Sequence, residues 1–116
     1  MREQHLLEGQ QACGEVVQQL GLLLTPTLGE PPVELGVLDM MSDDLAAYSE
    51  RLWRFTPFTY PFNVTGQPAI SLPLHRTAYG LPVGVQLVAA FGREDVLVRV
   101  AAQLERDLRG DSTPQL

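Results

Sequence analysis

The stretch FNVTGQPAISLPL, Phe62–Leu74, joins two kinds of secondary structure. Gly66 suits the left-handed conformation that ends many helices, and Pro68 follows soon after because proline cannot continue a helix. Thr59 is placed to cap a short helix ahead of this glycine, with Pro61 in the first turn. The letters AISLPL then read as a β-strand, and Pro68, which has no N–H to donate, suits its edge. The stretch therefore predicts a short helix, a turn and a strand.

Upstream of this stretch the sequence predicts two further helices and a strand. Apolar residues at helical spacing favour a helix over residues 3–20. The run Leu22–Leu24 is apolar without alternation, as is typical of a buried strand in a parallel sheet. Ser42 is placed to cap another helix, with Asp43 and Asp44 where the helix dipole favours anions. Adjacent carboxylates on a helix point in different directions, so we interpret this pair as capping residues rather than as a catalytic acid and base.

Downstream the sequence predicts a strand and a helix. Residues 79–90, YGLPVGVQLVAA, favour the strand, and the short polar connection before it allows an antiparallel hairpin with AISLPL. An apolar stripe at helical spacing follows, which Glu94 and Asp95 begin and Gly110 ends. Helices and strands in this order indicate an α/β layered fold.

Composition and charge exclude several classes of function. The chain has 116 residues, of which 45% are apolar, and this suits one small globular domain. Its net charge of −6 argues against nucleic acid as a partner. No apolar run approaches the roughly 20 residues of a membrane helix, and the N-terminus lacks a signal-peptide core, so we expect no membrane partner and a cytoplasmic location. One cysteine and two separated histidines form no metal cluster, and we expect no cofactor.

The residues that carry common chemistries are missing or out of place. The sequence has no phosphate-binding loop and no G-x-S-x-G nucleophile elbow. Ser71 lies inside a strand pattern without flanking glycines, so we interpret it as a structural serine. All eight basic residues are arginines, which excludes a lysine-assisted nucleophile within this chain. From its residues alone, the sequence is an α/β domain without an evident active site.

Three motifs, in order along the chain, resemble the amidase signature family. They are LLLTPTLGEPPVELG at residues 22–36, the stretch FNVTGQPAISLPL, and GLPVGVQLVAAFGREDVLVRVAAQLE at residues 80–105. The resemblance is to the C-terminal portion of the family's enzymes, and within the family to the branch containing 6-aminohexanoate cyclic-dimer hydrolase and related bacterial amidases. It implies the C-terminal part of an α/β/α sandwich with a mixed central sheet, formed by residues 1–110, with residues 111–116 as a flexible tail.

The same resemblance implies roles for particular residues. The family's catalytic Ser, cis-peptide Ser and Lys lie upstream of the matched region, so no catalytic residue is carried over to this chain. Segments just before Asn63 line the acyl side of the substrate pocket in family members. The candidates for substrate binding are therefore Trp53, Thr56, Phe58, Thr59 and Phe62. Aromatic core packing is an equally good interpretation of these positions. Thr56 stands where the glutamine-using branch has an acidic residue, which argues against glutamine amidotransfer.

Two functions remain open from the sequence. In the first, the chain is the C-terminal segment of a serine-type amidase that cleaves small carboxamides, and its partner is the upstream catalytic portion of the enzyme. In the second, it is a stand-alone, non-catalytic α/β module that self-associates through exposed strands.

Overall fold

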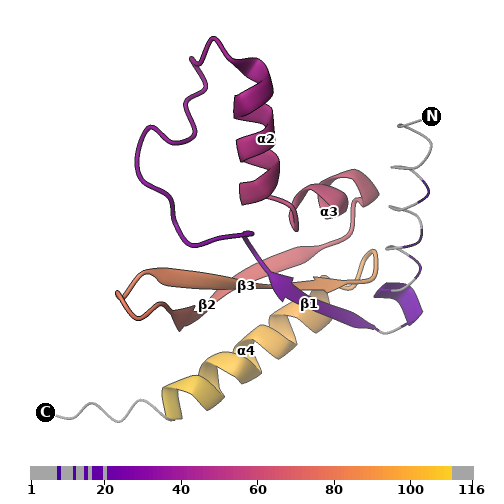
Figure 1. Cartoon of the computed structure of the whole chain (residues 1–116). Helices are drawn as coiled ribbons and strands as arrows, with labels where there is room; N and C mark the ends of the chain where they lie inside the picture. Colours follow the sequence, from indigo (N-terminus) through magenta and orange to yellow (C-terminus); the bar gives the residue numbers. More distant parts are fainter. Residues whose placement is uncertain (1–7, 9–11, 13–14, 16, 20, 111–116) are drawn as a thin grey trace, which may run out of the picture.

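The computed structural model describes Glu8, Ala12, Glu15, residues 17–19 and residues 21–110. The described residues before Gly21 are helical, whereas the rest of the predicted helix 3–20 and the predicted tail 111–116 lie outside the described residues. The elements that follow are β1 (Leu22–Pro26), α2 (Leu45–Phe55), α3 (Tyr60–Thr65), β2 (Ala69–Arg76), β3 (Pro82–Ala89) and α4 (Glu94–Gly110). This order, visible in Figure 1, confirms the predicted one.

The three strands form one antiparallel sheet in the order β1–β3–β2. β2 and β3 form the predicted antiparallel hairpin. The prediction that Leu22–Leu24 forms a parallel strand is wrong, because β1 runs antiparallel to β3, with Leu24 opposite Leu87. Leu24 is 62% exposed, so its apolar run does not reflect burial on both faces of a parallel sheet. Within the described residues the sheet is therefore antiparallel, and the mixed central sheet that the family resemblance implies for the whole enzyme stays a prediction.

The two faces of the sheet pack against different helices. Figure 1 shows α4 on one side of the sheet and α2 and α3 on the other. The α4 side holds the larger apolar cluster, whose buried members are Leu72, Leu87, Ala89, Leu97 and Ala101. The other side holds a smaller cluster, formed by Val17, Phe62 and Val88 with Leu23 partly buried. The predicted α/β layering is thus observed, with the sheet between helices.

The cap of α2 lies two residues after the predicted one. The Oδ1 atom of Asp44 accepts the N–H of Ala47 at 3.0 Å, which satisfies one of the free donors at the start of the helix. The hydroxyl of Ser42 instead accepts the N–H of Asp44 at 3.2 Å. Because the helix begins at Leu45, Ser42 stands too far ahead of it to act as the cap.

The short helix α3 follows the local signals of the sequence closely. Pro61 occupies its first turn, and Gly66 ends it with φ 72°, both as predicted. Thr59 precedes the helix as predicted, but its side chain makes no capping bond. The Thr59 hydroxyl lies 3.5 Å from the carbonyl oxygen of Thr56 instead, so it turns back toward the preceding segment.

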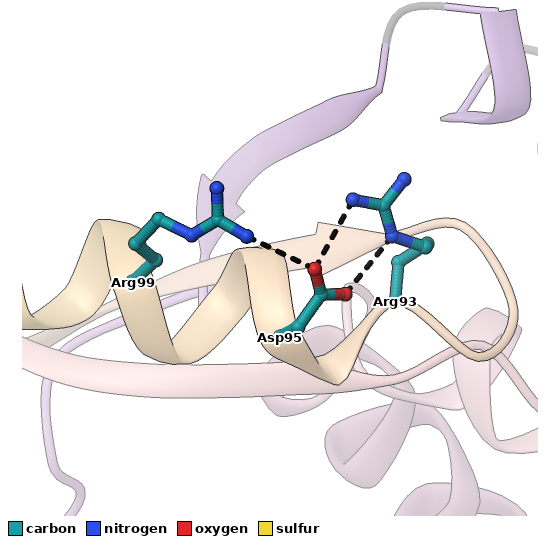
Figure 2. Close-up of polar contacts among 3 residues, drawn as sticks. All are labelled: Arg93, Asp95 and Arg99. Carbon is teal, nitrogen blue, oxygen red and sulfur yellow. Dashed lines mark hydrogen bonds and ion pairs between the residues drawn. The ribbon is translucent and has the colours of Figure 1, made fainter.

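Charged residues at the start of α4 stabilise its first turn. Figure 2 shows Arg93 and Arg99 reaching the carboxylate of Asp95. Arg93 Nε donates to Asp95 Oδ1 at 2.9 Å, and Arg99 Nη2 donates to Oδ2 at 3.1 Å. The hydrogen bond from Arg93, helped by the charges of both arginines, holds the pKa of Asp95 below its ordinary value. The predicted helix start at Glu94 and Asp95 is confirmed.

The chain is more open than a closed domain of its length. Its Cα radius of gyration is 17.0 Å, whereas about 13 Å is expected for a compact chain of this size. Its accessible surface is 8932 Å², against roughly 6,300 Å² for a compact monomer of the same mass. Large apolar side chains such as Leu24, Met41 and Phe91 are exposed. This surface has the character of one that other protein segments cover.

Candidate functional site

The predicted substrate-binding residues lie around the turn between α2 and α3, residues 56–59. Trp53, near the end of α2, is 51% exposed and meets Tyr60 of α3 edge to face, with ring centroids 4.7 Å apart and planes at 78°. This geometry is favourable for two aromatic rings. The Thr56 hydroxyl donates to the Leu52 carbonyl oxygen at 3.0 Å, so this hydroxyl is hydrogen-bonded to the last turn of α2. Phe58 is half-buried within the turn.

Phe62 points to a different environment from Trp53. It is buried, with 6% exposure, and packs with Val17 and Val88 in the smaller apolar cluster. The structure therefore brings the five candidates onto one short segment but gives them different surroundings. Trp53 contributes to the surface, and Phe62 contributes to the core of the described chain.

Gln86 is a buried polar residue that the sequence analysis did not single out. Its side chain is in the middle of β3 and the residue is only 4% exposed. Its Nε2 atom donates to Thr25 Oγ1 of β1 at 3.1 Å and to the carbonyl oxygen of Phe58 at 2.9 Å. The signal in the sequence was a single amide side chain inside the apolar run PVGVQLVA. Buried amides of this kind require partners, and here the partner is the α2–α3 turn.

The loop after β1 holds the end of α2 from another side. The N–H of Gly29 donates to the Phe55 carbonyl at 2.9 Å. Glu30 and Arg51 form a two-point ion pair, in which Arg51 Nη2 donates to Glu30 Oε2 at 3.1 Å. The hydrogen bond from Arg51 lowers the pKa of the Glu30 carboxyl, outweighing the effect of burial, which raises it. The loop, the turn and the sheet thus form one connected unit.

Two hydroxyl groups meet next to the start of β3. Thr27 Oγ1 and Ser71 Oγ are 2.6 Å apart, and both lie over Gly84, where a Cβ atom would be 2.7 Å and 2.8 Å from them. The structural interpretation of Ser71 agrees with this contact, because the partner of its hydroxyl is another hydroxyl and not a base.

A hollow of about 220 Å³ adjoins this contact. Its lining residues are Pro26, Leu28, Gly29, Glu30, Pro31, Pro32, Pro82, Val83 and Gly84. None of the five predicted substrate-binding residues lines it. Within the described part of the chain, no three His, Cys, Asp or Glu side chains gather where they would hold a metal ion. No described helix has the length and apolar character to cross a membrane.

The layered fold and the three ordered motifs together define the class of this chain. The sequence profile of the amidase family, described as Amidase, matches residues 1–98. The match covers most of the chain, and the chain belongs to the amidase signature family, as the motifs predicted.

Individual relatives point to one branch of this family. The chain is 50% identical over 90 residues to 6-aminohexanoate-cyclic-dimer hydrolase of Pseudomonas sp. (strain NK87). The matched region covers 72% of this chain and 18% of that protein. It is 48% identical over 89 residues to the enzyme of the same name from Paenarthrobacter ureafaciens, with the same coverage. It is also 45% identical over 84 residues to putative amidase AmiC of Mycobacterium tuberculosis (strain ATCC 25618 / H37Rv), covering 72% of this chain and 17% of that protein.

A solved structure supports the same relationship at the level of the fold. The chain matches 6-aminohexanoate cyclic dimer hydrolase complexed with substrate with a TM-score of 0.70 and 40% sequence identity. The match covers 87% of this chain and 23% of that one. The chain thus spans about a fifth of the length of the relatives it matches, and its α/β structure corresponds to part of their fold.

Proposed function

We propose that this chain is the C-terminal segment of a serine-type amidase that cleaves carboxamide bonds. In this proposal residues 1–110 form part of one amidase domain in the cytoplasm. The segment supplies three strands and a wall of the substrate pocket, and the Ser–cis-Ser–Lys machinery comes from a catalytic portion upstream. The single observation that carries the proposal is the match to a substrate-binding amidase structure over 87% of this chain but 23% of the matched one.

The catalytic residues are assigned elsewhere because this chain has no lysine. A serine hydrolase of the kind implied by the family resemblance needs a base to take the proton of its nucleophile. Ser71, the serine in the sheet, contacts Thr27 and no base. The chemistry therefore requires residues that the 116-residue sequence does not supply.

The unpaired edges of the sheet and its exposed apolar side chains support the proposal that a catalytic portion packs against this chain, either as part of the same polypeptide or as a separate one. β1 and β2 lie at the two edges of the sheet, so each has backbone donors and acceptors without a strand partner in the described sheet. Leu24 of β1 is exposed on the α4 side. Additional strands and helices would pair with these edges and cover this apolar surface.

The α2–α3 segment is the proposed pocket wall. Trp53, Thr56, Phe58 and Thr59 would face the acyl part of a small carboxamide, and Phe62 would support them from the core. The aromatic rings offer apolar walls. Burying a neutral polar group there without a hydrogen bond costs about 2–7 kcal/mol, and burying an unpaired charge costs more. The proposed substrate class is therefore an amide with an uncharged acyl group, aliphatic or aromatic, and the name of the relatives, 6-aminohexanoate-cyclic-dimer hydrolase, supports the aliphatic kind.

The proposal is tested with a complete polypeptide that carries this segment after an amidase catalytic portion. A fluorophosphonate probe, which labels activated serines, should label the complete polypeptide at a serine outside residues 1–116, and the polypeptide should hydrolyse aliphatic amides. The 116-residue chain alone should be neither labelled nor active. Labelling of the 116-residue chain that Ser71→Ala abolishes would contradict the proposal.

A second function is favoured by the same exposed surface. A non-catalytic module that forms homo-oligomers would pair the edges of β1 or β2 with those of another copy. Sedimentation velocity at micromolar concentration separates the two proposals. A discrete dimer or higher oligomer of the 116-residue chain, unchanged by an added catalytic portion, favours the module.

A further inference from the structure

The hydrogen bonds of Gln86 tie a turn to the middle of the sheet. We infer that Gln86 is a positioning residue that sets the place of the α2–α3 turn, and through the turn the geometry of the Trp53–Tyr60 pair. The inference about position concerns only this chain. Its consequence for substrate selectivity rests on the proposed function.

Both donors of the Gln86 amide are used. A glutamine amide has two N–H donors, and these reach Thr25 Oγ1 and the Phe58 carbonyl oxygen. A carbonyl oxygen only accepts hydrogen bonds, so the amide nitrogen and not the amide oxygen must face Phe58. The Thr25 hydroxyl then holds the same amide group from the neighbouring strand. The hydrogen bond to Thr25 therefore orients the Gln86 amide so that its other N–H points at the Phe58 carbonyl oxygen.

The hydrogen bond from Gln86 reaches the middle of the turn that joins α2 to α3. Phe58 lies between Phe55, the last residue of α2, and Tyr60, the first residue of α3. The bond from Gly29 to the Phe55 carbonyl holds the end of α2, whereas the bond from Gln86 holds the middle of the turn. Because Gln86 is only 4% exposed, bulk water has little access to this hydrogen bond. Water would therefore not readily replace the amide donor if the glutamine were removed.

The aromatic pair reports the placement of the two helices. Trp53 belongs to α2 and Tyr60 belongs to α3, and their rings touch across the turn at 4.7 Å. A shift of the turn changes the angle between the helices and hence this contact. Trp53 is the single tryptophan of the sequence, so the tryptophan emission and the tryptophan bands of the near-ultraviolet circular dichroism arise from this place alone.

The first test uses the unaltered full chain. In nuclear magnetic resonance spectra, the two Nε2 protons of Gln86 should exchange with solvent more slowly, by about tenfold or more, than those of an exposed glutamine such as Gln103. Rapid exchange of the Gln86 side-chain protons would overturn the inference without any variant.

The second test compares two substitutions in the full chain. Gln86→Met keeps the length of the side chain but removes both donors. Ser71→Ala is the matched control, because Ser71 pairs with Gln86 in the register and loses only its bond to Thr27. Gln86→Met should change the near-ultraviolet signal of Trp53 and speed exchange of the Thr56 amide by about tenfold, at temperatures where the far-ultraviolet spectrum is that of the native chain. Ser71→Ala should change neither.

The outcomes separate positioning from general stability and from the proposed function. An unchanged Trp53 signal in a folded Gln86→Met chain would show that the turn does not depend on Gln86, and the inference would be wrong. In a complete amidase carrying this segment, Gln86→Met should change the preference between short and long acyl chains by about tenfold through KM, with a smaller change in kcat. A changed Trp53 signal with unchanged selectivity would support the positioning role and refute the assignment of this segment to the pocket.

Discussion

Replacing Gly29 by alanine tests how closely the loop after β1 approaches α2. A Cβ atom on Gly29 would lie 2.3 Å from the carbonyl oxygen of Arg54 and 3.1 Å from ring carbons of Pro57. The near atom belongs to the backbone, so it cannot rotate away as the end of a side chain can. The loop and the end of α2 must separate, which strains the bond from Gly29 N–H to the Phe55 carbonyl.

The expected loss of stability has two parts. Overpacking at a close contact costs about 1–3 kcal/mol, and loss of one hydrogen bond adds about 1 kcal/mol. The free energy of unfolding should therefore fall by about 2–4 kcal/mol. For 116 residues the entropy of unfolding is about 0.24 kcal/mol/K, so this loss lowers Tm by about 8–16 °C.

Thermal and urea unfolding followed by far-ultraviolet circular dichroism measure this effect. Gly66→Ala is the control, because a Cβ atom there meets nothing within 4 Å and its cost, about 1–2 kcal/mol, comes from the positive φ of 72° alone. Gly29→Ala should be the more damaging of the two. A Gly29→Ala chain that melts within about 3 °C of the unaltered chain would refute the reasoning, because the loop and α2 would then not be in close contact.

Three further predictions use the same unfolding measurements. Leu97→Ala, on the buried face of α4, should cost about 2–5 kcal/mol, whereas Val98→Ala, at a residue that is 64% exposed, should cost less than about 0.5 kcal/mol. The lowered pKa of Asp95 stabilises the folded chain fully above its unfolded pKa of about 4. The difference in Tm between the unaltered chain and Asp95→Asn should therefore shrink as the pH falls from about 4 through the lower pKa of the folded state; a constant difference contradicts it. Phe62→Ala should cost about 3–5 kcal/mol, whereas Trp53→Ala, which removes the contact with Tyr60 from a half-exposed ring, should cost less, about 0.5–1.5 kcal/mol; the reverse order would exchange their assigned roles.

Elements that depend on neighbouring residues could be predicted from the sequence. Gly66 ends α3 because only its own φ matters there, and Glu94 begins α4 because the helix signals lie within one turn. The start of α2 was less well predicted, since Ser42 and Asp44 are both good caps and the choice depends on where the chain leaves the preceding loop.

Pairings over long sequence distances could not be predicted in the same way. The direction of β1 is set by β3, whose Leu87 lies opposite Leu24, and nothing local to either strand specifies this. The roles of Phe62 and Gln86 are of the same kind. Phe62 is a core residue because it packs with Val88, and Gln86 is tied to a turn because the Phe58 carbonyl oxygen lies within hydrogen-bond distance of its side chain. Composition and spacing identify such residues as aromatic or polar but do not supply their partners.

The two faces of the sheet explain why the candidate site lies on the side of α2 and α3. In the register of the sheet, Thr25 of β1 and Ser71 of β2 each stand opposite Gln86 of β3, so the three side chains share a face. The face toward α4 is apolar, and its cluster needs only shape and hydrophobic burial. The other face carries directional hydrogen bonds, one of which fixes the turn at Phe58. Directional bonds hold a segment in one place more strictly than apolar packing does, and a pocket wall requires that precision. Under the proposed function, the polar face is therefore the one on which this chain would contribute to the substrate pocket.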